Sequence, residues 1–74
     1  MDTLLGILKE ANGKIDYENE TALIDGGLID SLELMEIISE IEDEFDIEIG
    51  MEDIVPENFN SAKAMYALIE RLKK

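Results

Sequence analysis

The sequence predicts an all-α fold in which three main helices and one short helix form a bundle, with a long loop after the first helix. Apolar residues recur at helical spacing in three separate stretches of the chain. The single short run that alternates polar and apolar residues has no partner with which to form a sheet. Glycine and proline are absent from the strongest helical stretch, residues 31–45. We therefore expect one helical domain over residues 1–74.

The first helix is predicted over residues 1–10, and a long loop follows it. The apolar face of this helix is made of Leu4, Leu5 and Leu8. Asn12 and Gly13 are expected to end the helix, because both tolerate a left-handed turn. Residues 14–29 show no clear period and predict a loop, which apolar residues near its end would pin onto the bundle. Long ordered loops are uncommon in compact domains and often carry function.

The strongest helical pattern covers residues 31–45. Its apolar stripe is formed by Leu34, Ile37, Ile38, Ile41 and Phe45. Acidic residues fall largely on the opposite side of this helix. Either Asp30 or Ser31 is expected to cap its N-terminus, because a short side-chain oxygen can accept a hydrogen bond from the free amides of the first turn.

The last third of the chain predicts a loop, a short turn and a final helix. Residues 46–49 alternate polar and apolar side chains but have no partner strand, so we expect a loop. Residues 51–55 favour one helical turn that Pro56 stops, because the residue before a proline is pushed out of the helical region. The last helix is predicted to begin near Asn60, a good cap. Its apolar face consists of Met65, Leu68, Ile69 and Leu72.

The chain is strongly acidic, with a formal net charge of −13. Such a surface repels nucleic-acid phosphates and anionic headgroups, so we expect no nucleic-acid partner and no insertion into a membrane. No basic residue occurs between positions 15 and 62, and this block is expected to attract proteins with Arg and Lys patches. No stretch is apolar enough to span a bilayer, and no signal peptide is recognisable, which favours a cytoplasmic location.

The composition also argues against catalysis. There is no cysteine and no histidine, so thiolate nucleophiles and the usual base of a serine hydrolase are missing. The best window for a calcium loop, residues 46–57, has Gly50 where a ligand oxygen is needed and Met51 where the glycine belongs. We therefore expect no metal site and no catalytic residue, and the chain is not expected to be an enzyme.

One segment, residues 26–49, carries a specific pattern around a serine. Asp30, Ser31 and Leu32 form an Asp-Ser-Leu triplet at the start of the predicted second helix. Apolar residues follow the serine by four, six, seven, ten and fourteen positions: Met35, Ile37, Ile38, Ile41 and Phe45. A glycine-bearing loop precedes the triplet, and an acidic run lies near the end of the segment. With these features, the segment resembles the phosphopantetheine attachment region of the acyl and peptidyl carrier protein family.

The resemblance implies an acyl carrier protein-like four-helix bundle with Ser31 as the site of attachment of a 4′-phosphopantetheine arm, beside Asp30 and Leu32. A phosphopantetheinyl transferase would move the arm from coenzyme A to the serine hydroxyl. The chain would then hold acyl or aminoacyl groups as thioesters and deliver them, as a monomer, to partners with basic patches: adenylating enzymes or ligases, acyltransferases and synthases. The expected docking residues are Glu33, Met35, Glu36, Glu40 and Asp43.

Several branches of this family fit the sequence. Residues 55–59, Val-Pro-Glu-Asn-Phe, are similar to a stretch of D-alanyl carrier proteins and other stand-alone carriers, whereas the acidity is closer to that of fatty acid carriers. Gly50 stands where many fatty acid carriers have proline. Fatty acid, polyketide, nonribosomal peptide and D-alanyl pathways therefore all stay open. The alternative from another class is an unmodified, small acidic interaction module that docks through its second helix.

Overall fold

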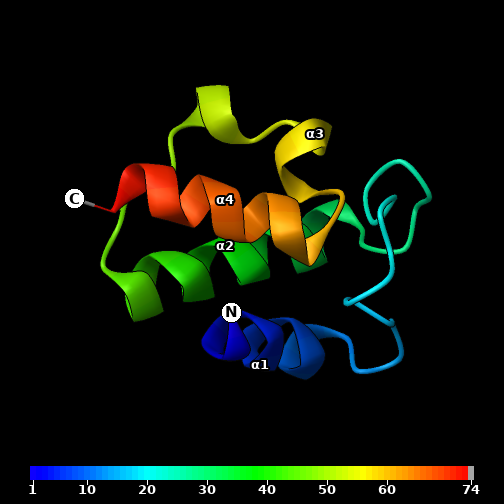
Figure 1. Ribbon diagram of the computed structural model, residues 1–74. Helices are drawn as coiled ribbons and strands as arrows, with labels where there is room; N and C mark the ends of the chain where they lie inside the picture. Colours follow the sequence, from blue (N-terminus) through cyan, green and yellow to red (C-terminus); the bar gives the residue numbers. More distant parts are fainter. Residues whose placement is uncertain (74) are drawn as a thin grey trace.

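The computed structural model of the chain describes residues 1–73, and Lys74 lies outside the described residues. The elements, in order, are α1 (Asp2–Ala11), α2 (Ser31–Phe45), the 3₁₀ helix η1 (Met51–Asp53), α3 (Pro56–Phe59) and α4 (Ala62–Leu72). Between residues 1 and 73 there is no strand, so the predicted all-α class is confirmed. α1 packs against α2 and α4, while α3 packs against α4 and the long first loop closes one end of the bundle (Figure 1).

The core collects the apolar faces of every α-helix together with part of the first loop. Its largest fully buried side chains are Leu4, Leu8, Leu23, Ile37, Ile41, Phe59, Met65, Leu68 and Ile69. Burial of a side chain of this size contributes roughly 1.5–3 kcal/mol, which is the main stabilising term in so small a chain. No charged or polar side chain is buried among the described residues. All charge therefore lies on or near the surface.

The boundary of the first helix matches the sequence prediction to within one residue, but the way in which it ends does not. Asn12 is extended (φ −156°, ψ 101°) rather than left-handed. The end is fixed instead by hydrogen bonds: the Asn12 amide donates to the Leu8 carbonyl at 2.9 Å. The Asn12 carbonyl in turn accepts the hydroxyl of Tyr17 at 2.7 Å. A buried loop side chain therefore replaces the expected left-handed turn.

The region around Pro56 also differs from the sequence prediction. The turn expected before the proline is present as η1, but Pro56 then begins α3 and does more than end the preceding turn. Proline suits the first position of a helix, where its missing N–H would have no partner. Asn60 does not cap the last helix, because Ser61 does, accepting the Ala64 amide at 3.0 Å. Asn60 follows α3 and has a different task, described below.

The first loop ends in a compact hydrogen-bonded turn that needs glycine. The Gly26 amide donates to the Ala22 carbonyl at 2.7 Å, and a Cβ at Gly26 would lie 2.6 Å from that same oxygen. Gly27 has φ +72°, in the left-handed region that favours glycine. The amides of Leu28 and Ile29 both donate to the Leu23 carbonyl, at 3.0 and 3.1 Å. The chain is thereby folded back immediately before α2.

This turn leads to a test of the fold by a matched pair of substitutions. Gly26→Ala is expected to destabilise the protein by about 1–3 kcal/mol, because its Cβ would press on a backbone carbonyl. Gly6→Ala, within α1 and with nothing in reach of the new Cβ, is expected to stabilise it by about 0.5–1 kcal/mol. Urea unfolding of both variants measures the two changes. Equal effects would contradict the close approach at Gly26.

Candidate functional site: the N-terminus of α2

The N-terminus of α2 is closed by a reciprocal pair of hydrogen bonds. Asp30 is the N-cap, and its Oδ1 accepts the Glu33 amide at 2.8 Å. The Glu33 carboxylate in return accepts the Asp30 amide at 3.5 Å. Of the two candidates named from the sequence, Asp30 is therefore the cap. Capping boxes of this kind fix the first turn of a helix.

Because Asp30 caps the helix, the hydroxyl of Ser31 is not needed for capping. Ser31 is the first residue of α2 and is exposed. Within the described part of the chain its hydroxyl makes no hydrogen bond, and neither do the backbone amides of Ser31 and Leu32. These amides lie at the positive end of the helix dipole, where an anion such as a phosphodiester is stabilised. The observed geometry fits a phosphate group bonded to the Ser31 oxygen.

Exposed apolar side chains occur close to this serine in the sequence. Leu32 is 78% exposed, Met35 is 56% exposed and Leu28 is 40% exposed. They are among the few large apolar residues on the surface of the described chain. Since burying such side chains against another protein is favourable, they suit the centre of a contact region.

A single amide side chain holds the loop in front of α2. Asn60 Oδ1 accepts the amides of Ile24 and Asp25, at 3.0 and 2.9 Å. Asn60 Nδ2 donates to the Asp25 carboxylate at 3.0 Å, and the Asn60 carbonyl accepts the Leu23 amide at 2.9 Å. We call this set of hydrogen bonds the Asn60 clamp. It ties the junction of α3 and α4 to the turn that leads into Ser31.

The other part of the first loop is anchored by Tyr17. This side chain is buried, and its hydroxyl donates to the Asn12 carbonyl. Burial first, and the negative charge of Glu33 second, raise the pKa of Tyr17 above its usual value of 10.0. The hydroxyl therefore stays protonated, and remains a donor, throughout the neutral range. The loop is fixed to α1 by Tyr17 and to α4 by the Asn60 clamp.

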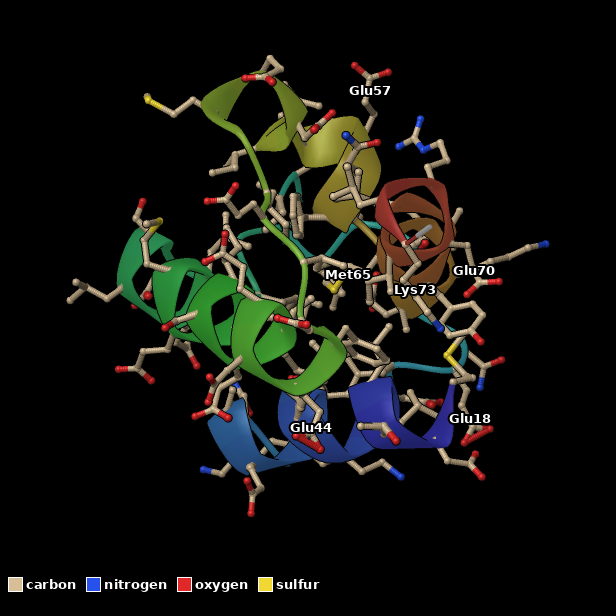
Figure 2. The ribbon with its side chains drawn as sticks, turned by 90° about the vertical axis from the view of Figure 1, so that its left-hand side faces the viewer. Glu18, Glu44, Glu57, Met65, Glu70 and Lys73 are labelled. Carbon is tan, nitrogen blue, oxygen red and sulfur yellow. The ribbon has the colours of Figure 1, made fainter. Side chains whose placement is uncertain are left out.

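The acidic face of α2 has few internal partners. Met35, Glu36, Glu40 and Asp43 are exposed, whereas Glu33 is half-buried and engaged in the cap. Across residues 1–73 the structure contains one salt bridge, between Lys73 and Glu70 of α4, at 3.6 Å. Figure 2 shows that pair at the C-terminal end of α4. The carboxylates of Glu36, Glu40 and Asp43 therefore face solvent and make no salt bridge within the described chain.

The sequence pattern singled out Asp30, Ser31 and Leu32, which the structure places together at the N-terminus of α2, but it gave no indication of the role of Asn60. An asparagine before a helical stretch predicts a cap, and no local pattern distinguishes a cap from a clamp. The bonds in question join residues 35 and 36 positions apart. Only a set of related sequences, in which position 60 and the first loop changed together, would have revealed the contact between Asn60 and that loop.

Comparisons with known proteins agree with the resemblance to carrier proteins. Residues 2–69 match the model of the family described as "Phosphopantetheine attachment site". The chain is 32% identical over 60 residues to "Probable acyl carrier protein PigG" of a Serratia species, covering 81% of this chain and 69% of that protein. It is 33% identical over 69 residues to "Aminoacyl carrier protein 2" of Bradyrhizobium diazoefficiens, covering 93% of this chain and 76% of that protein. No solved structure gives a significant match.

The Asn60 clamp can be tested by removing its side chain. Asn60→Ala leaves the amides of Ile24 and Asp25 without their acceptor, and should lower the free energy of unfolding by about 1–3 kcal/mol. Hydrogen exchange at these two amides should accelerate more than exchange in α4. Asn19→Ala is the control, because Asn19 makes only an exposed local bond to Asp16 and should change stability by less than about 0.5 kcal/mol. Similar losses in both variants would refute the clamp.

Proposed function

Because this chain belongs to the phosphopantetheine attachment family, we propose that Ser31 is the residue that bears the arm. The observation that supports this most strongly is an exposed serine hydroxyl at the N-terminus of α2, beside amides that no other described group uses. Asp30 shapes the site as the cap, and Leu32 provides an apolar surface next to it. The Asn60 clamp holds the preceding turn so that the hydroxyl faces solvent.

The family sets the general activity. Its members carry covalently attached 4′-phosphopantetheine and act as acyl or aminoacyl carriers, and they catalyse no reaction themselves. When bound, the group supplies a thiol at the end of a flexible arm, to which a cargo is joined as a thioester. This chain therefore needs no cysteine of its own. Tethering raises the concentration of cargo near successive enzymes.

The residues of this chain would contribute position and charge to the modification. The Ser31 oxygen would attack the pantetheine-side phosphorus of the coenzyme A pyrophosphate; the P–O bond to adenosine 3′,5′-bisphosphate breaks, this bisphosphate leaves, and the serine proton goes to a base. The sequence holds no histidine, so we propose that the transferase supplies this base. The free amides of Ser31 and Leu32 would then stabilise the charge on the new phosphodiester.

Carrier proteins interact with phosphopantetheinyl transferases and with the enzymes of synthesis, and we propose that α2 is the surface used here. Leu32 and Met35 would form the apolar centre of the contact. The carboxylates of Glu36, Glu40 and Asp43 would steer basic patches toward it. Glu33, which is engaged in the cap, would contribute mainly through its negative charge.

The stretch Val-Pro-Glu-Asn-Phe says little about the cargo, because several of its residues have structural roles in the fold. Pro56 begins α3 and Phe59 is buried in the core. Asn58 donates to the Asp53 carbonyl at 2.8 Å and accepts from Arg71 at 3.3 Å. We therefore propose a thioester of the acyl or aminoacyl class without choosing among the pathways.

The attachment site can be tested by intact mass. After incubation with coenzyme A and a broad-specificity phosphopantetheinyl transferase, the wild-type chain should gain one phosphopantetheine unit. Ser31→Ala should gain none. Thr3→Ala is the control, since Thr3 also carries an exposed hydroxyl on a helix, and it should be modified like the wild type.

Two outcomes would contradict the proposal. An unchanged mass of the folded wild-type chain would favour an unmodified acidic interaction module. Modification of Ser31→Ala would place the arm on another residue. Circular dichroism of each variant shows that a negative result does not come from unfolding.

A further inference from the structure

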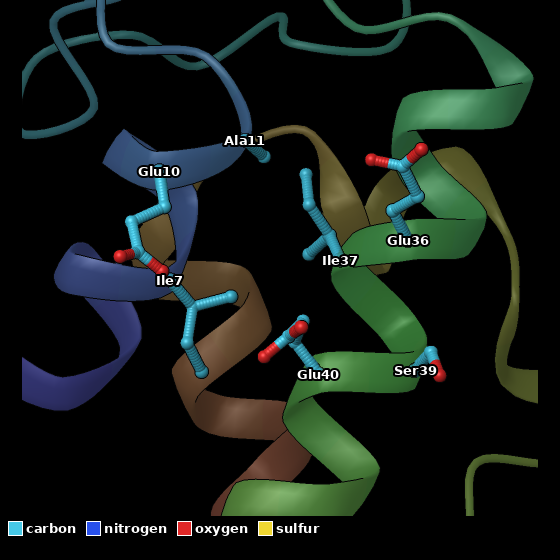
Figure 3. Close-up of a pocket in the computed structure, with 7 residues that line it drawn as sticks. All are labelled: Ile7, Glu10, Ala11, Glu36, Ile37, Ser39 and Glu40. Atoms are coloured by element: carbon cyan, nitrogen blue, oxygen red, sulfur yellow. The ribbon is translucent and has the colours of Figure 1, made fainter.

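A groove between α1 and α2 is not explained by attachment of the arm. It is an open hollow of about 370 Å³. Its lining residues are Ile7, Glu10, Ala11, Glu36, Ile37, Ser39 and Glu40. Figure 3 shows Ile7 and Ala11 of α1 across from Ile37 of α2, with the Glu40 side chain extending toward α1. The groove thus combines an apolar floor with an acidic rim.

The apolar floor is accessible in part. Ile37 belongs to the buried core, whereas Ile7 and Ala11 are only half-buried. A hydrocarbon chain laid between the two helices would cover these surfaces and gain the free energy of apolar burial. A purely apolar occupant would, however, bring the surrounding carboxylates out of water without a partner, which is unfavourable.

The rim carries an uncompensated charge. Glu36 and Glu40 lie four positions apart on α2, where like charges destabilise a helix by about 0.2–0.5 kcal/mol. Glu10 adds a third carboxylate from the last turn of α1, the end of a helix where negative charge is unfavourable. None of these groups makes a salt bridge in the part of the chain that is described. Binding of a cationic group would relieve these unfavourable electrostatic interactions.

We infer that this groove receives an arginine side chain of the phosphopantetheinyl transferase, so that α1, through Glu10, takes part in docking together with α2. The methylene groups of an arginine would cover the exposed parts of Ile7 and Ala11, next to the buried Ile37. Its guanidinium carries five donors and is weakly hydrated, so it can bridge the carboxylates of Glu10 and Glu40. A lysine offers a compact, strongly hydrated charge that cannot bridge in this way. The identity of the partner rests on the proposed function, whereas the binding chemistry of the groove does not.

The first experiment tests the groove alone. Butylguanidinium is titrated into the unmodified chain while the methyl signals of Ile7 and Ile37 are followed by NMR. Saturable shifts at both methyls, larger than those produced by butylammonium, are expected. Glu10→Gln should weaken this binding about three- to tenfold. Glu57→Gln, an identical change on α3 at a distance from the groove, should leave it unaltered (Figure 2).

The second experiment tests the partner. In the transfer of phosphopantetheine to the chain, Glu10→Gln should raise KM for the carrier about three- to tenfold with little change in kcat, while Glu57→Gln behaves like the wild type. The thermal midpoint of Glu10→Gln should not fall, because the change removes a charge from the unfavourable end of α1.

Each result bears on the inference. Absent methyl shifts, or equal weakening by Glu10→Gln and Glu57→Gln, would overturn the groove as a guanidinium site and leave only a general effect of net charge. Normal methyl binding with an unchanged KM would overturn the transferase as the partner. If the wild-type chain accepted no arm at all, the proposed function would fail, and the methyl titration would still decide whether the groove binds a guanidinium.

Discussion

The hydrogen bonds of Asn60 are the constraint on which the geometry of this site depends. Four of them join the α3–α4 junction to the turn formed by Leu23, Ile24 and Asp25. That turn folds the chain back immediately before Asp30, whose side chain accepts the Glu33 amide and leaves the amides of Ser31 and Leu32 free. A small domain has little stability to spare, so one well-placed side chain that satisfies several backbone groups has a large effect. The clamp thus connects the α3–α4 junction to the turn that precedes the exposed Ser31 hydroxyl, at the same end of the bundle.

The distribution of charge follows from the composition of the small core. The core holds no charged side chain, so every side-chain carboxylate of the described residues lies at or near the surface. Some of these groups serve the fold: Glu33 and Asp30 close α2, and Glu42 accepts the Ile49 amide at 2.9 Å. Others, including Glu36 and Glu40, make no such bond within residues 1–73. Division of one acidic surface between structural and unpaired groups explains how so small a chain can fold and still present a charged face.

Much of this structure could be predicted from the sequence, because its strongest signals are local. The bounds of α2 follow from an unbroken apolar stripe and a good cap, and the triplet around Ser31 lies at the start of that helix. Features that depend on distant neighbours could not be predicted. In the sequence Pro56 predicts the end of a helical turn, whereas in the structure it begins α3, which packs on α4. In the sequence Asn60 predicts a helix cap, whereas in the structure it binds the first loop. The α1–α2 groove exists only once α1, with Glu10, and α2, with Glu40, are packed together.

The central claim is that the N-terminus of α2 is a preformed platform for a phosphodiester on Ser31. Amide NMR spectra recorded before and after enzymatic modification, with a phosphorus spectrum of the product, test it most directly. The account predicts one phosphodiester signal and large shifts at the amides of Ser31 and Leu32, with Ile24 and Asp25 nearly unmoved. A product in which those first two amides do not respond, or in which the clamped turn and the core rearrange, would contradict it.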